Sequence, residues 1–159
     1  MSARKPLVVI QGQISQLNYP DTLDGYQEVD LYTTENEQGS TITTGQPVYA
    51  SSSGKVSLAK ADDPTTKEFA GLVKANIADG ATGIVQTGGV VVGTTTEWDA
   101  VTGDSGGLTP NSDYYLSTDT AGKLTKVAPT GSGMYIVKMG RAASPTNMLI
   151  LDQHAVQLA

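Results

Sequence analysis

The chain has 159 residues, enough for about one domain with a core of its own. It contains no cysteine and a single histidine, His154, which excludes disulfides, thiolate metal centres, a cysteine nucleophile and sites built from several histidines. The net charge of -6 offers no basic face for phosphates, so neither nucleic acid nor an anionic membrane is expected as a partner.

The composition predicts an all-β protein. The chain contains 18 glycines and seven tyrosines. Charged residues make up only 16%, below the roughly 25% usual for globular domains. β-branched and aromatic residues favour strands, and glycine favours the turns between them. We therefore expect short strands joined by turns, and no helix.

The first 27 residues contain one apolar stretch and no hydrophobic unit that could close on itself. Residues 6–17 begin as a strand and continue as a looser polar extension, and residues 18–25 carry turn signals. We interpret residues 1–27 as an extended arm and residues 28–159 as the β domain; an edge strand of the same domain is the alternative. Because the strand has no obvious hairpin partner within the arm, it is expected to pair with another subunit. The apolar side chains of this expected interface are Leu7, Val8, Val9 and Ile10.

A hairpin with a glycine turn occurs twice in the domain. The copies are residues 48–58, with Gly54 in the turn, and residues 114–126, with Gly122 in the turn. A strand follows each copy and carries a Val-Lys pair, Val73–Lys74 and Val137–Lys138. The pattern favours an internal duplication; the alternative is that similar repeated patterns occur in any β protein built from glycine-turn hairpins.

The remaining segments add further strands. Residues 78–93 place Gly88–Gly89 between two β-branched runs, as a tight hairpin would require, and a last strand covers residues 146–152. Together, the segments of the whole chain predict about nine or ten short strands. This number and spacing predict an antiparallel β-sandwich or a small β-barrel.

The stretch from Gly103 to Gly107 matches the string around the nucleophile of trypsin-like serine proteases, with Ser105 at the nucleophile position. That chemistry needs a histidine base, which the protease family places before the serine. Here the only histidine, His154, follows Ser105. We therefore interpret this motif as a coincidence of small turn-forming residues.

Two carboxylates, Glu97 and Asp99, flank Trp98. On a strand they would share one face, and a glycosidase needs two carboxyls roughly 5 to 9.5 Å apart. An exposed loop in which Trp98 anchors a protein interface is the preferred interpretation. Calcium binding by Asp62–Asp63, or by Asp21 with Asp24, lacks the EF-hand spacing. No catalytic, cofactor or metal site is expected.

Several segments are similar to phage structural proteins. Ala78-Asp79-Gly80-Ala81-Thr82-Gly83 and the strand up to Val91 resemble the core of small capsid decoration (cement) proteins of tailed phages. Segments frequent in phage head and tail-fibre proteins are similar to residues 107–110, 114–117, 122–125 and 140–142. Phage fibre N-termini are similar to residues 5–9 and 21–25.

The resemblance implies a non-enzymatic virion structural protein without cofactors. It is expected to be made in the host cytoplasm, to form a homotrimer, and to stabilise the major capsid protein lattice from the outer surface of the head. An acidic chain suits that surface, because the DNA lies inside. The alternative is a head- or tail-fibre component that binds the host surface or a glycan through aromatic side chains. The aromatic residues expected at an interface are Trp98, Tyr114 and Tyr115.

Overall fold

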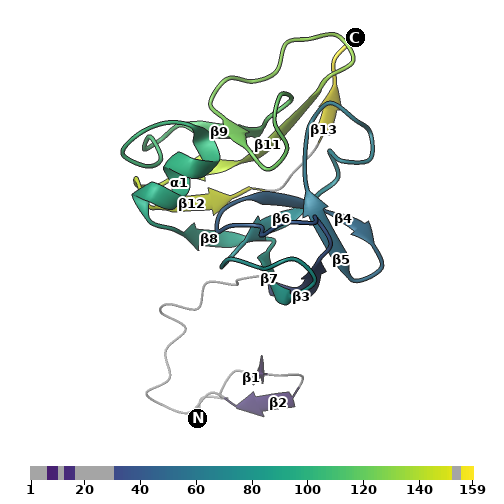
Figure 1. Cartoon of the computed structure of the whole chain (residues 1–159). Helices are drawn as coiled ribbons and strands as arrows, with labels where there is room; N and C mark the ends of the chain where they lie inside the picture. Colours follow the sequence, from purple (N-terminus) through teal and green to yellow (C-terminus); the bar gives the residue numbers. More distant parts are fainter. Residues whose placement is uncertain (1–6, 11–12, 17–30, 152–154) are drawn as a thin grey trace.

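The computed structural model describes residues 31–151 and 155–159 in full, and residues 7–10 and 13–16 as strands without their side chains. This part contains thirteen strands and one helix (Figure 1). The strands are β1 Leu7–Ile10, β2 Gln13–Gln16, β3 Leu31–Asn36, β4 Pro47–Ser52, β5 Lys55–Leu58, β6 Phe69–Val73, β7 Thr82–Gln86, β8 Gly89–Val92, β9 Asp113–Leu116, β10 Leu124–Thr125, β11 Tyr135–Ala142, β12 Asn147–Ile150 and β13 Ala155–Gln157, and the helix is α1 Thr95–Thr102. The all-β prediction is confirmed, whereas the expectation of no helix is wrong. Within the described residues no helix has the length and apolar character needed to cross a membrane.

The first two strands form an antiparallel pair of their own. Leu7 is opposite Gln16, and Ile10 is opposite Gln13. The expectation that the first strand lacks a hairpin partner within the arm is therefore wrong, because residues 13–16 form a strand where a looser extension was expected. Only residues 11 and 12 separate the two strands, and two residues suffice for a hairpin turn. The side chains of Leu7, Val8, Val9 and Ile10 lie outside the described residues, so their place in an interface remains a prediction.

Strands β3 to β7 close into a small barrel in the order β3-β5-β4-β6-β7. Strand β3 completes the closure by pairing antiparallel with β7 and parallel with β5. Side chains alternate between the two faces of a strand, so each strand sends every second residue inward. The interior is filled by Ile42, Val48, Val56, Val73, Ile77 and Val85, each at most 2% exposed.

The second sheet has the order β10-β9-β11-β12-β8, with β13 paired to the beginning of β11. Strand β8 is an edge strand of this sheet. The prediction of a tight hairpin at Gly88–Gly89 is wrong, because β7 and β8 do not pair with each other. Strand β7 pairs with β3 and β6, whereas β8 pairs with β12. These two glycines instead carry the chain from the barrel to the second sheet.

The two sheets have the same topology. Each unit has five strands, β3 to β7 in the first and β8 to β12 in the second. When the strands of each unit are numbered one to five along the chain, both units have the spatial order 3-2-4-5-1: β5-β4-β6-β7-β3 and β10-β9-β11-β12-β8. Both predicted glycine hairpins are present, as β4–β5 and β9–β10, and Gly54 and Gly122 adopt positive φ angles of 74° and 73°. The shared topology supports the internal duplication.

Backbone hydrogen bonds between equivalent residues repeat in both units. The Gly45 N–H donates to the Val73 carbonyl at 2.8 Å, and the Asn111 N–H donates to the Ala142 carbonyl at the same distance. Both donors have positive φ, 80° at Gly45 and 63° at Asn111. Val73 therefore corresponds to Ala142. The Val-Lys pairs that were matched in the sequence are therefore not equivalent, because Val73 corresponds in the structure to Ala142 and not to Val137.

A glycine permits the same close approach in each unit. Gly71 in β6 and Gly140 in β11 each follow a register shift against the neighbouring strand. A Cβ atom at Gly71 would lie 2.6 Å from the Gln86 carbonyl oxygen, and one at Gly140 would lie 2.3 Å from that of Leu149. The bulge and its glycine are thus a shared feature of the two repeats.

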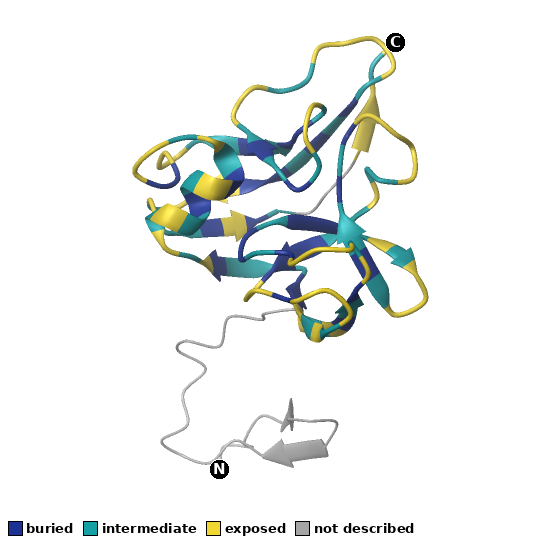
Figure 2. Cartoon of the chain, viewed as in Figure 1, coloured by how far each residue is buried: buried dark blue, intermediate teal, exposed yellow. Residues whose placement is uncertain are grey.

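One core cluster joins the repeats. It combines Ala59, Ala61 and Leu72 of the first repeat with buried side chains of α1 and the second sheet (Figure 2). Backbone bonds cross the same boundary, since the Tyr135 N–H donates to the Ala61 carbonyl at 3.0 Å. The two repeats therefore pack as one domain.

Candidate protein-binding surface

Two of the three aromatic side chains expected at an interface are buried. Trp98 and Tyr114 are both 0% exposed and belong to the core cluster that joins the repeats. Trp98 lies on α1, where its ring packs against the backbones of Gly45 and Gly93. The interface prediction is wrong for these two residues, because the folded domain encloses them. Tyr115, the next residue on β9, points the other way and is half-buried.

The carboxylates beside Trp98 hold the ends of α1. The Thr94 N–H donates to the Glu97 carboxylate at 2.7 Å, and the Glu97 N–H donates to the Thr94 hydroxyl oxygen at 3.2 Å, which together form a capping box. The Asp99 carboxylate accepts from the N–H groups of Gly106 and Gly107. Residues two apart on a helix are separated by roughly 200°, so the shared face that a strand would give is absent.

The protease-like motif begins at the C-cap of α1 and continues into the turn that follows it. Gly103 caps α1 in the left-handed conformation, with a φ angle of 73°. Asp99 then holds the turn at Gly106 and Gly107. Ser105 lies exposed in this turn, and His154 is outside the described residues. The helix end thus accounts for the glycines of the motif.

The suggested calcium loop is an ordinary turn. The Asp63 carboxylate accepts from the N–H groups of Thr65, at 2.8 Å, and Thr66, while Asp62 forms an ion pair with Lys60 at 2.6 Å. Asp21 and Asp24 lie outside the described residues. Among the described residues, no group of three His, Cys, Asp or Glu side chains could hold a metal ion.

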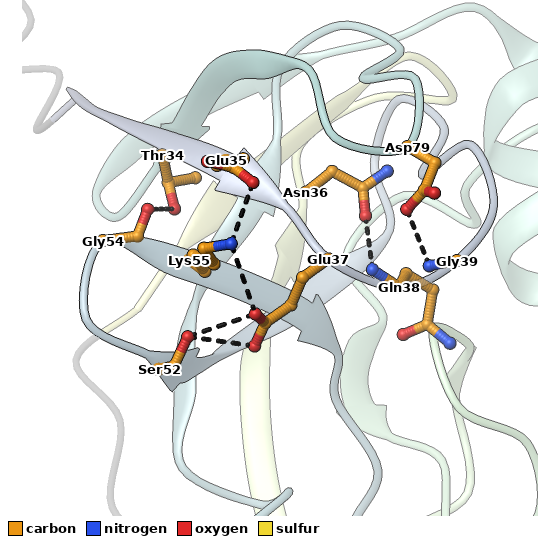
Figure 3. Close-up of polar contacts among 10 residues, drawn as sticks. All are labelled: Thr34, Glu35, Asn36, Glu37, Gln38, Gly39, Ser52, Gly54, Lys55 and Asp79. Atoms are coloured by element: carbon orange, nitrogen blue, oxygen red, sulfur yellow. Dashed lines mark hydrogen bonds and ion pairs between the residues drawn. The ribbon is translucent and has the colours of Figure 1, made fainter.

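A polar cluster lies where β3 and β5 close the barrel (Figure 3). Lys55 Nζ lies 3.0 Å from the Glu35 carboxylate and 3.9 Å from that of Glu37, which also accepts from the Ser52 hydroxyl at 3.1 Å. Beside it, the fully buried Asn36 amide donates to the Ser40 and Ile77 carbonyls, both at 2.8 Å. The charged groups pair with one another and backbone carbonyls satisfy the Asn36 amide, so these contacts reinforce the closure of the barrel.

A second charged cluster lies on the outer face of β9 and β11. Asp113 forms ion pairs with Arg141 Nε and Lys138 Nζ, each at 2.8 Å. Hydrogen bonds from Arg141, and then from Lys138, hold the pKa of Asp113 at about 2, below its ordinary value of 3.8. Arg141 lies directly opposite Asp113 in the strand register. The cluster therefore ties the two strands together across their faces.

We expect the Asp113→Asn variant to lose part of the acid sensitivity of the wild-type fold. Because the folded-state pKa lies below the unfolded value, the carboxylate stabilises the fold above that unfolded value. The contribution is lost as the pH falls from about 4 to about 2. Urea unfolding at about pH 5 and about pH 2 should show a smaller drop for the variant than for wild type. Asp119→Asn is the matched control, because Asp119 makes no ion pair within the described residues. Equal drops in the Asp113→Asn variant and wild type would contradict this role.

The strands β7, β8 and β12 form a surface without charge. No Asp, Glu, Lys, Arg or His occurs in residues 80–96 or 143–151, although the whole chain carries a net charge of -6. Within the described residues six large hydrophobic side chains are exposed, and four of them lie on these strands and on the adjoining β3. They are Leu31, Ile84, Val92 and Leu149, at 44%, 42%, 63% and 40% exposure.

We define the uncharged surface by the outward residues of the paired strands β3–β7 and β8–β12. Thr33 is opposite Ile84, Val90 is opposite Leu149, and Val92 is opposite Asn147, so the members of each pair point to the same face. Its uncharged members are Leu31, Thr33, Thr82, Ile84, Val90, Val92, Asn147 and Leu149. Two charged residues border it: Glu35 is opposite Thr82 and pairs with Lys55, and Arg141 is opposite Leu149 and pairs with Asp113. The uncharged members can be buried against another protein without desolvating a charge of their own, and both bordering charges already have ion-pair partners.

Sequence reasoning missed this surface, although the sequence holds a signal for it. The two charge-free stretches, residues 80–96 and 143–151, stand out in an acidic chain. Only the fold brings them together, because β8 and β12 pair as neighbours in the second sheet. A scan against protein-family models and a search of curated proteins both give no match to this chain.

Proposed function

We propose that the chain is a non-enzymatic structural protein of a tailed-phage virion, which binds the outer surface of the head and stabilises the major capsid protein lattice. The uncharged surface carries this proposal from the side of the structure. It places four exposed apolar side chains on the two strand pairs β3–β7 and β8–β12 of an acidic protein. Exposed apolar groups that gather in this way mark protein-binding sites. The sequence resemblance to cement proteins supplies the identity of the partner.

Cementing follows from mass action. A protein that binds only the assembled lattice stabilises that lattice by an amount set by its concentration and affinity. The acidic remainder of the chain would face the solvent outside the head, away from the packaged DNA. The arm of residues 1–27 and its apolar side chains Leu7, Val8, Val9 and Ile10 are proposed to add contacts to a neighbouring subunit.

The fibre alternative has less support from the structure. Glycan binding was expected to use aromatic faces, and Trp98 and Tyr114 are enclosed in the core. Tyr115 alone of the three reaches the surface, where it is half-buried beside the Asp113 cluster. An aromatic platform for a sugar would need at least one ring free to stack.

We expect the Leu149→Asp variant to bind phage heads at least about tenfold more weakly than wild type, which corresponds to a loss of about 1.4 kcal/mol or more in binding free energy. The reason is that contact with the shell would bury a carboxylate in place of an apolar side chain, with only Arg141 among the described residues, opposite position 149 and already paired with Asp113, near enough to compensate it. Sedimentation of the purified protein with heads that lack it measures the affinity. Val127→Asp is the matched control, because Val127 is 73% exposed and lies outside the uncharged surface.

Circular dichroism must show that both variants remain folded. Equal affinities of wild type and Leu149→Asp would exclude the uncharged surface as the contact. A wild-type chain that does not bind heads at all would overturn the proposed function itself.

A further inference from the structure

Strand β8 ends its sheet with an open edge. The Gly93 N–H donates to the Thr146 carbonyl at 2.9 Å, which identifies Gly93 and Thr146 as a hydrogen-bonded pair of the β8–β12 ladder. Hydrogen-bonded pairs alternate with non-bonded ones in an antiparallel ladder. Val91 therefore bonds to β12, while Val90 and Val92 direct their N–H and C=O groups away from the sheet. Figure 1 shows β8 at the margin of the second sheet.

The equivalent edge of the first repeat is satisfied. Strand β3 occupies the position of β8 in the shared topology, and it pairs with β5 through Glu35–Lys55 and Asn36–Val56. In the second repeat β8 has no such partner within the described residues. One side chain partly covers the edge, since Gln86 Nε2 donates to the Val90 carbonyl at 2.9 Å.

The usual protection of an edge strand is missing at β8. Proteins commonly guard such edges with Lys, Pro, an inward-pointing charge or a bulge. Residues 80–96 contain neither a charged residue nor a proline, and the β8–β12 register runs without a shift. An edge of this kind can accept another strand.

We propose that β8 pairs antiparallel with β8 of a second copy of this chain, about a two-fold axis that passes beside Val91. Val90 of one copy then lies opposite Val92 of the other, so the Val92 N–H of one copy takes the place of Gln86 Nε2 as donor to the Val90 carbonyl of its twin, and the Val90 N–H donates to the Val92 carbonyl. In this register the outward donors and acceptors of one β8 strand lie opposite the acceptors and donors of the other. Two acidic chains can approach here because neither contributes a charge to the contact.

The pairing uses the edge of β8 and leaves its outer face free. The exposed side chains of Val92 and Leu149 from both copies then lie on one continuous sheet face. The dimer would present the uncharged surface twice, which strengthens attachment to a repeating shell. This two-fold pairing predicts a dimer where the resemblance implies a homotrimer. It does not rest on the proposed function.

Engineered cysteines test this register directly, because the chain has none of its own. Residues in a hydrogen-bonded antiparallel pair have Cα atoms about 5.5 Å apart, which a disulfide can bridge. Val90→Cys and Val92→Cys are made separately, then exposed to a mild oxidant either alone or as an equal mixture. The mixture should link up to about half of the chains into dimers, since half of randomly paired dimers contain both variants. Each variant alone should link at least about tenfold less, since two copies of the same position lie more than about 7 Å apart.

Leu149→Cys is the matched control. It exposes a thiol on the same face, but β12 of one copy and β12 of the other would be separated by three strand spacings, about 14 Å. Light scattering of the wild-type chain should give twice the chain mass of 16.5 kDa. A monomer or a trimer, or a mixture that links no better than the single variants, would overturn the pairing. Binding to heads is measured separately, so either proposal can fail while the other stands.

Discussion

Replacing Trp98 with alanine should lower the free energy of unfolding by about 3–5 kcal/mol, the usual cost of deleting a large aromatic side chain from a core. Trp98 is 0% exposed and lies between the two repeats. A Cβ atom placed on Gly45 of the first repeat or on Gly93 of the second would lie 3.0 Å from its ring. The indole N–H also donates to the Thr146 carbonyl at 2.9 Å. Alanine would leave a cavity where the repeats meet.

Urea unfolding followed by circular dichroism measures this loss, because the variant has no tryptophan left for fluorescence. Trp98→Phe should cost less, since it keeps much of the packing and the Thr146 carbonyl still accepts from the Gly93 N–H. Val127→Ala, at an exposed position, should change stability by no more than about 0.5 kcal/mol. A Trp98→Ala variant within 1 kcal/mol of wild type, on the order of an average point mutation, would contradict the joining role of Trp98.

Gly140→Ala should destabilise the fold by about 1–3 kcal/mol, as expected for an overpacked interior, although it adds a single methyl group. The new Cβ atom would lie 2.3 Å from the Leu149 carbonyl oxygen. Backbone atoms must move to relieve that contact, which disturbs the β11–β12 pairing at the bulge. The same substitution at Gly71 should act similarly in the first repeat, since its Cβ would lie 2.6 Å from the Gln86 carbonyl oxygen.

Gly131→Ala is the matched control for these two variants. Gly131 is exposed, and a Cβ atom there would meet only the flexible Met134 side chain, at 3.1 Å. Thermal unfolding should therefore separate Gly71→Ala and Gly140→Ala from both wild type and Gly131→Ala. If the two bulge variants melt together with the control, the close approach is not a shared constraint of the repeats.

The hairpins could be predicted from sequence because their determinants are local. Residues 48–58 and 114–126 each combine strand-forming residues with a glycine that takes positive φ, and both form hairpins. The Gly88–Gly89 pair carries a similar local signal, yet β7 and β8 enter different sheets. Barrel closure through β3 and β5 depends on contacts between distant residues, and so no local pattern could reveal it.

The helix was missed although it has clear end signals. Thr94 and Glu97 form a capping box, and Gly103 provides the left-handed C-cap. The eight residues between them are rich in threonine and include valine and aspartate, which are weak helix formers. The weak helix-forming character of these residues therefore led to the expectation of no helix, despite the capping residues at both ends. Reading Trp98 as exposed followed from the same error, because only the helix turns it toward Gly45 and Gly93.

Electron cryo-microscopy of phage particles assembled with this chain is the decisive experiment for the proposed function. We expect density for the domain on the outer surface of the head, with Ile84, Val92 and Leu149 of the uncharged surface turned toward the major capsid protein. Density for the chain only in a tail fibre, or a head contact made by the charged faces while the uncharged surface lies in solvent, would contradict it.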